Sequence, residues 1–331
     1  MKKFLATFVG MSLLLASASC GGNAKAENSD ATDSVATDSV ATVYYIKDIT
    51  PESLVKVYDA LGRKATGNKI GIKISTGESN KSNHLDTALI SNLVRTIGGT
   101  FIEANTAYAG NRNDSKKHYQ TAKEHGFVDL AGVDIMDSEG TVVLPLEGGK
   151  HLKKDIVGKT FPEYDFVVVL SHFKGHQMGG FGGALKNISI GIASSEGKTY
   201  IHTGGKIENP DSIWNNTAEQ DVFLESMADA AKAITDHLGD RVLYINVANR
   251  LSVDCDCNGN PEEPHMHDLG VFASLDPVAL DRACVDAVYN SDDPGKEDLI
   301  ERIRSRHCEV ILTASEELGI GTQKYNLITI E

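Results

Sequence analysis

Short runs of apolar, often β-branched residues alternate along the chain with longer stretches whose apolar positions recur at helical spacing. This alternation is typical of strands that are connected by helices over a mainly parallel sheet. The predicted strands are at residues 70–75, 100–105, 165–172, 242–249 and 269–274. The predicted helices are at residues 51–61, 86–99, 114–125, 217–238, 276–289 and 296–306. The predicted fold class is α/β, with a mainly parallel sheet and helices on both faces.

The run DFVVVLSH at 165–172 is apolar at every position from Phe166 to Leu170. A strand with two apolar faces is expected at the centre of a sheet that helices cover on both sides. Ligands of open α/β sheets gather beyond the carboxyl ends of such strands. The residues that follow the predicted strands are therefore the first candidates for a functional site.

The amino-terminal residues have a different character. Residues 1–20 follow the pattern of an export signal, with two lysines, an apolar run too short to span a bilayer and small residues before Cys20. The Cys20–Gly21–Gly22 sequence resembles a lipoprotein processing site. Residues 21–42 are polar, repeat ATDSV and predict a flexible tether. We expect residues 43–331 to form the α/β domain, as one unit or as two subdomains. We also expect the lipid to anchor it to the periplasmic or cell-surface face of a bacterial membrane.

Net charge limits the classes of binding partner, and cysteine content limits the class of fold. The formal net charge of −14 disfavours nucleic acid and anionic membrane surfaces as binding partners. The chain holds only 5 cysteines, so it is not a disulfide scaffold. Cys284 and Cys308 lie in predicted helices, where buried structural thiols are expected.

The segment SHFKGHQMGGFGGALKN follows the predicted central strand directly. Glycines let backbone N–H groups approach an anion, lysines add charge, and histidines transfer protons or bind metal near neutral pH. The candidate catalytic residues are His172, Lys174 and His176. The candidate ligand-binding residues are Gly179, Gly180, Gly182, Gly183, Lys186 and Asn187. The alternative is a glycine-rich turn with solvated lysines.

The segment DCDCNGNPEEPHMHDLG at 254–270 is rich in metal-ligand residue types. Cys255, Cys257, His265 and His267 are candidate ligands for a transition metal, with zinc, iron and nickel all open. The spacing is not that of a known zinc or ferredoxin site. A Cys255–Cys257 disulfide in an oxidising compartment and a plain polar loop are the alternatives.

Three weaker candidates follow other predicted structural elements. Ser75 and Thr76, with Glu78 as an acid/base group, would hold an anion after the strand at 70–75. Arg112 would pair with a carboxylate, and His202 is a further candidate.

Several motifs together resemble the domain of unknown function 362 family, often labelled uncharacterised Fe–S-centre proteins. They are KISTGE, EANTAYAGNR, VVLSHFKGHQMGGFGGALKNISIGIAS, DCDC and DLGVFASLDPVALDRAC. The label implies an Fe–S cluster, but the ferredoxin-like CxxCxxCxxxC module of many relatives is missing from this sequence. HFKGHQMGGFGGALKN is also similar to loops of the nickel-pincer lactate racemase family. That similarity implies acid/base roles for His172 and His176.

These observations predict an exported, metal-dependent enzyme that acts on a small anionic substrate. A non-catalytic lipoprotein that binds an anion or a metal is the alternative, and a redox partner that uses Cys255 and Cys257 is another. Because both candidate segments follow strands of one parallel sheet, we expect the segments at 172–187 and 255–267 to face one cleft.

Overall fold

The structure, a computed structural model, describes residues 40–331. The predicted signal segment 1–20, with the lipidation at Cys20, lies outside the described residues, as does most of the predicted tether. The first strand begins at Ala41, so the last two residues assigned to the tether belong to the sheet. No helix in residues 40–331 has the length and apolar character needed to cross a membrane.

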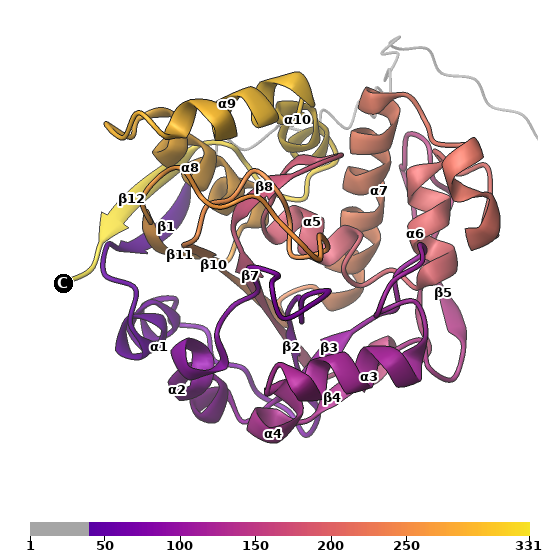
Figure 1. Cartoon of the computed structure of the whole chain (residues 1–331), viewed down its shortest axis with the longest axis horizontal. Coiled ribbons are helices and arrows are strands. Elements are labelled where there is room, and N and C mark those ends of the chain that lie inside the picture. The colour runs from indigo at the N-terminus through magenta and orange to yellow at the C-terminus, as the bar shows by residue number, and fades with distance from the viewer. Residues whose placement is uncertain (1–39) are drawn as a thin grey trace, which may run out of the picture. The chain divides into compact units, whose positions relative to one another are not determined.

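The central sheet has eight strands in the order β12-β1-β11-β10-β7-β2-β3-β4 (Figure 1). Their bounds are β1 (Ala41–Ile46), β2 (Ile70–Lys73), β3 (Thr100–Glu103), β4 (Val133–Ile135), β7 (Phe166–His172), β10 (Val242–Ala248), β11 (Gly270–Ser274) and β12 (Tyr325–Thr329). Strands β10, β7, β2, β3 and β4 run parallel, while β11 is antiparallel to both β10 and β1. Two hairpins lie outside this sheet, β5 (Thr141–Pro145) with β6 (Lys154–Gly158), and β8 (Lys174–His176) with β9 (Gly180–Gly182).

Ten α-helices are found in the described residues. They are α1 (Pro51–Ala60), α2 (Thr87–Ile97), α3 (Ser115–Glu124), α4 (Phe127–Ala131), α5 (Ala184–Ser189), α6 (Ser195–His202), α7 (Gln220–Leu238), α8 (Pro277–Tyr289), α9 (Lys296–Ser305) and α10 (Glu309–Glu317). Two short 3-10 helices span Phe161–Glu163 and Pro210–Asn215. The six predicted helices are all present, with ends within three residues of the prediction.

Helices cover both faces of the sheet, which confirms the predicted α/β class. Alternate residues of β7 enter two different cores: Val167 and Val169 pack on the side of α5, α7 and α8, whereas Val168 and Leu170 pack on the side of α1 and α2. Figure 1 shows α1, α2 and α4 on one side of the strands and α5, α7 and α8 on the other. Burial on both sides explains why every residue of β7 is buried.

The order of the strands places a crevice between β2 and β7. The chain passes from β2 outward to β3 and β4, and then returns to the opposite side of β2 as β7 and β10. The connections after β2 and β7 therefore leave in opposite directions and leave room at the carboxyl ends of these two strands.

Candidate functional site

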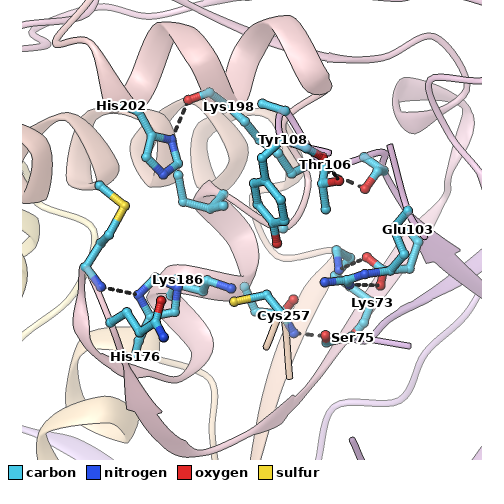
Figure 2. A pocket seen from close by; sticks show the side chains of 18 of the residues that line it. Lys73, Ser75, Glu103, Thr106, Tyr108, His176, Lys186, Lys198, His202 and Cys257 are labelled. Atoms are coloured by element: carbon cyan, nitrogen blue, oxygen red, sulfur yellow. Dashed lines mark hydrogen bonds and ion pairs between the residues drawn. The ribbon is translucent and has the colours of Figure 1, made fainter. Parts of the chain in front are cut away.

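A cavity of about 230 Å³ lies beyond the carboxyl ends of β2, β3 and β7 (Figure 2). Lys73 and Glu103 are the last residues of β2 and β3, and both line the cavity. The other charged and polar side chains in its wall include Ser75, Tyr108, Arg112, His176, Lys186, Asn187, Lys198 and His202, together with Cys257. Seven of the residues singled out from the sequence thus meet at one place, namely Ser75, Arg112, His176, Lys186, Asn187, His202 and Cys257.

Asn187 ties the cavity to the sheet. Its Nδ2 donates to Ser171 Oγ at 3.0 Å and to the Lys73 carbonyl at 3.4 Å, so one side chain joins the ends of β7 and β2. Asn187 lies on α5, next to Lys186. These bonds fix α5 above the crevice and direct Lys186 into the cavity.

Two cations of the cavity wall are paired with buried carboxylates. Lys73 Nζ lies 2.9 Å from Glu103 Oε2, and Arg112 Nε lies 3.0 Å from Glu78 Oε2. Arg112 also approaches Glu103 at 3.6 Å. Burial alone would raise the pKa of Glu103, but Lys73 and the other cationic partners hold it well below its usual range. These groups form a charge-balanced base for the cavity.

Lys186 and Lys198 have no carboxylate partner among the described residues. Lys198 Nζ donates to the carbonyls of Ala104 and Ala193, and burial lowers its pKa to about 8. The side-chain Nζ of Lys186 makes no hydrogen bond or ion pair within residues 40–331. Burial, followed by the nearby Lys174 and Arg112 charges, lowers its pKa to about 7. The cavity thus carries uncompensated positive charge, and an anion is the ligand that this charge favours.

The two histidines of the cavity are neutral and are held as different tautomers. His176 Nδ1 accepts hydrogen bonds from the backbone N–H groups of Met178 and Gly179, at 3.2 and 2.8 Å. The proton of the neutral ring is therefore on Nε2. Burial and the Lys186 charge keep the pKa of His176 well below its ordinary value. His202 Nδ1 instead donates to the Lys198 carbonyl at 2.6 Å, and burial lowers its pKa to about 4. His176 offers a donor and His202 an acceptor.

His172 and Lys174, two of the three predicted catalytic residues, are used differently. His172 Nδ1 lies 2.8 Å from Asp256 Oδ1, and His172 Nε2 lies 2.6 Å from the Asn249 carbonyl oxygen. Lys174 Nζ lies 3.0 Å from Asp256 Oδ2 and donates to the His172 carbonyl. All three side chains are buried and none lines the cavity. We call this trio, His172, Lys174 and Asp256, the clamp, because it holds the loop after β10 against the end of β7.

The two candidate segments face one cleft, because His176 and Cys257 both line the cavity. Strands β7 and β10 are parallel neighbours, with Val247 opposite His172. His176, Cys255 and Cys257 offer ligand atoms that all lie within 4.8 Å of one another, a group of the kind that holds a transition metal. In this structure Cys255 and Cys257 form a disulfide, one of the alternatives that the sequence left open. A metal would need that bond to open first, because the ligand form of cysteine is the thiolate.

His265 and His267, the other predicted metal ligands, lie apart from the cysteines. His265 Nδ1 is hydrogen-bonded to Asp298, which raises the pKa of His265. His267 Nε2 lies 3.7 Å from Asp293 and its side chain is 96% exposed. Neither belongs to the group of His176 and the two cysteines.

The four candidate glycines contact protein atoms. Gly183 precedes α5, and the helix's first N–H groups, those of Ala184 and Leu185, donate to the Asp281 carboxylate at 2.8 and 2.9 Å. A Cβ on Gly183 would lie 2.3 Å from Asp281 Oδ1. A Cβ on Gly180, whose φ is +77°, would lie 2.4 Å from Cys308 Cβ. Gly179 packs against His176, and Gly182 against Lys174. The positive end of α5 thus already holds a carboxylate.

The weaker candidates divide between the wall and its support. Arg112 and His202 line the cavity, and Arg112 is paired with the carboxylate of Glu78. Thr76 lies behind the wall, where its N–H donates to Glu103 Oε1 at 2.9 Å. Sequence reasoning missed Lys73, Glu103 and Lys198. The signal for the first two was a charged residue at the end of an apolar strand.

The fold and site define an α/β protein with a cation-rich cavity at the carboxyl edge of its parallel strands. The sequence profile described as "Domain of unknown function (DUF362)" matches residues 70–286, and the chain belongs to that family. No curated protein matches the chain in sequence.

Two solved structures are similar in part. One is the lactate racemase apoprotein from Thermoanaerobacterium thermosaccharolyticum, at 16% identity and a TM-score of 0.42, over 88% of this chain and 83% of that one. The other is a structural-genomics protein from Thermotoga maritima, at 12% identity and a TM-score of 0.39, over 81% of this chain and 58% of that one.

Proposed function

We propose that this protein is an enzyme that binds a small organic anion in the cavity and transfers a proton with Lys186. The supporting observation is the placement of Lys186, which lines the cavity without a carboxylate partner for its ammonium among the described residues. A bound carboxylate or phosphate would supply the missing negative charge. The export signal at residues 1–20 and Cys20 favour action outside the cytoplasm on a lipid anchor, which also remains a proposal.

The chemistry assigned to each residue follows from its hydrogen bonds. His176 Nε2–H donates to an oxygen of the bound anion, because Nδ1 is occupied by two backbone N–H groups. With a pKa of about 7, Lys186 can give or take a proton near neutral pH. The disulfide leaves no thiolate for a metal, so the proposed proton transfer uses Lys186 alone. A transition metal held by the reduced cysteines and His176 would polarise a substrate oxygen.

Anion binding tests the proposal. Titration of the protein with acetate, propionate and phosphate by calorimetry should show binding that weakens by up to about tenfold between pH 6 and pH 8, because Lys186 loses its charge above about pH 7. Lys186→Met should weaken binding at pH 6 by at least about tenfold, or ~1.4 kcal/mol.

Lys116→Met is the matched control. It removes the same charge from an exposed position on α3 that does not line the cavity. Equal affinity of the two variants would contradict the assignment of Lys186. Hydrogen–deuterium exchange at carbon next to the carboxylate of a bound anion, followed by NMR, separates an enzyme from a binding protein. Binding without any exchange across the anions tested would favour the non-catalytic alternative.

A further inference from the structure

We propose that the Cys255–Cys257 disulfide undergoes reversible thiol–disulfide exchange with small anionic thiols that enter the cavity, and that Cys257 is the sulfur they attack. The inference rests on the anion selectivity proposed above and adds a second chemistry to the same cavity. Four features of the described residues carry it: the unequal exposure of the two sulfurs, the anchoring of the residue between them, the charge beside them, and the isolation of the other thiols.

The two cysteines differ in access. Cys257 lines the cavity and is partly exposed, whereas Cys255 is 1% exposed. A thiolate must approach along the S–S axis from the side of the sulfur it attacks, so only Cys257 is open to a molecule in the cavity. Cys255 is placed as the leaving sulfur and, afterwards, as the internal thiol that can displace the ligand.

The loop that carries both cysteines is fixed by bonds that do not depend on the disulfide. Asp256, the residue between them, is held by His172 and Lys174 in the clamp. Its carbonyl accepts from the Glu78 N–H at 3.0 Å, and the Cys255 carbonyl accepts from the Asn258 N–H at 2.9 Å. Opening the S–S bond therefore leaves the two sulfurs near each other, so the bond can form again.

A cation that lines the same cavity as Cys257 selects the attacking molecule. Figure 2 shows the Lys186 side chain pointing toward the Cys257 sulfur across the middle of the cavity. Lys186 has no counterion among residues 40–331, so a carboxylate on the incoming thiol would pair with it. The volume of about 230 Å³ matches a small molecule.

The exchange balances without any other reactant. A thiolate RS⁻ attacks Cys257 Sγ, the S–S bond breaks, and Cys255 leaves as a thiolate that takes up the proton lost by RSH. A second RS⁻ attacks the RS sulfur of the mixed disulfide and releases RSSR and the reduced Cys257. Each disulfide thus accepts two electrons from two thiols. The reverse reaction with RSSR restores the Cys255–Cys257 bond.

The remaining cysteines of the described chain do not interfere with a test. Cys284 and Cys308 are buried. Burial raises the pKa of the Cys284 thiol well above its usual range, and the same cause raises that of Cys308. Both should be inert toward small thiols and alkylating agents in the folded protein.

The experiment compares three small thiols of different charge on the oxidised full chain. 3-Mercaptopropionate, 2-mercaptoethanol and cysteamine are added at equal thiolate concentration, and their rates are normalised to those on a small neutral disulfide. Adducts and free thiols are mapped by peptide mass spectrometry after alkylation. We expect mercaptopropionate to open the bond at least about tenfold faster than cysteamine, with the adduct on Cys257. Normalised rates that are independent of charge, or an adduct on Cys255, would overturn the inference.

Variants separate this inference from the proposed function. Lys186→Met should remove the preference for mercaptopropionate while 2-mercaptoethanol still opens the bond, and Lys116→Met should leave both unchanged. Cys255→Ser should leave a reactive Cys257 thiol, whereas Cys257→Ser should leave an unreactive Cys255, at comparable melting temperatures. If propionate binds with the expected dependence on Lys186 but mercaptopropionate leaves the disulfide closed, the exchange is refuted and the anion site stands. If propionate does not bind either, both proposals fail.

Discussion

The clamp and the cavity wall lie side by side at the end of β7, and they differ in how their charges are matched. In the clamp, the Asp256 carboxylate contacts both His172 and Lys174, so its buried charge is balanced. In the cavity, Lys186 has no carboxylate partner within the described residues and Nε2 of His176 has no hydrogen-bond partner there. His172, Lys174, His176 and Lys186 come from the same short stretch of sequence, yet the protein pairs the first two with Asp256 and leaves the other two open to a ligand.

The difference teaches that residue type alone does not identify a lysine or histidine that binds a ligand. The distinguishing property is whether the protein itself supplies a partner for the side chain. A buried charge is costly unless a partner or a ligand compensates it. If stability were the only requirement at this position, we would expect a carboxylate partner for Lys186 or an uncharged residue in its place. The comparison predicts that removal of a clamp charge affects stability, and that removal of a cavity charge affects binding.

The largest expected effect is on the clamp. Asp256→Asn leaves the Lys174 ammonium and the His172 ring buried beside a neutral group, so the free energy of unfolding should fall by about 3–5 kcal/mol. Chemical denaturation at pH 7 measures it. Asp240→Asn, which removes an ion-paired carboxylate whose side chain is 95% exposed, should change stability by less than about 0.5 kcal/mol. Similar losses for the two variants would break the comparison.

The stability that Asp256 contributes should depend on pH. Burial acts to raise the pKa of Asp256, but Lys174 and His172 hold it well below its ordinary value. The stability that Asp256 contributes is therefore fully present above the pKa of an unfolded aspartate, at about pH 4, and is lost as the pH falls toward the folded value. The gap between the natural protein and Asp256→Asn should narrow below about pH 4.

The cavity should respond in the opposite direction. Lys186→Met removes a cation that the fold does not compensate, so it should raise the free energy of unfolding by ~1 kcal/mol at pH 6. A lysine whose folded pKa is lowered to about 7 destabilises the fold most below that pH, and the penalty disappears as the pH rises toward 10.5. The gain should thus shrink in alkaline solution. Destabilisation by Lys186→Met at pH 6 would place Lys186 with the clamp.

Hydrophobic periodicity predicted most of the helices and strands of the fold. The run at 165–172 is the central strand β7 because it is apolar on both faces. The predicted helix at 276–289 is α8, whose N-cap is Asp276. Helix α6 was not predicted because it is short and buried on nearly all sides, so it has no amphipathic period. The antiparallel pairing of β11 also has no local signal, since pairing depends on distant strands.

The position of the site could be predicted from the sequence. Which of its residues line the cavity and which pair with other protein groups could not. Parallel strands share one carboxyl edge, so His176, Lys186 and Cys257 could be expected together. That His172 and Lys174 bind Asp256, and that Asp281 caps α5, depends on side chains 84, 82 and about 97 residues away along the chain. A sequence shows which charges are present, but their pairing is a property of the folded chain.

The smallest expected effect is spectroscopic and concerns His176. Since Nδ1 accepts two backbone hydrogen bonds and the pKa of the ring lies well below its usual value, the ¹⁵N shifts of His176 should report the Nε2–H tautomer and stay constant from pH 5 to pH 8. Exposed His265, whose pKa Asp298 raises, should titrate within the same series and serves as the internal control. Addition of propionate should shift the His176 Nε2–H proton downfield, because the anion then accepts the hydrogen bond that the protein leaves unmade. If the His176 ring titrates over the same pH range as His265, it is solvated and protonated like an exposed histidine. That result would contradict its assignment to the anion site.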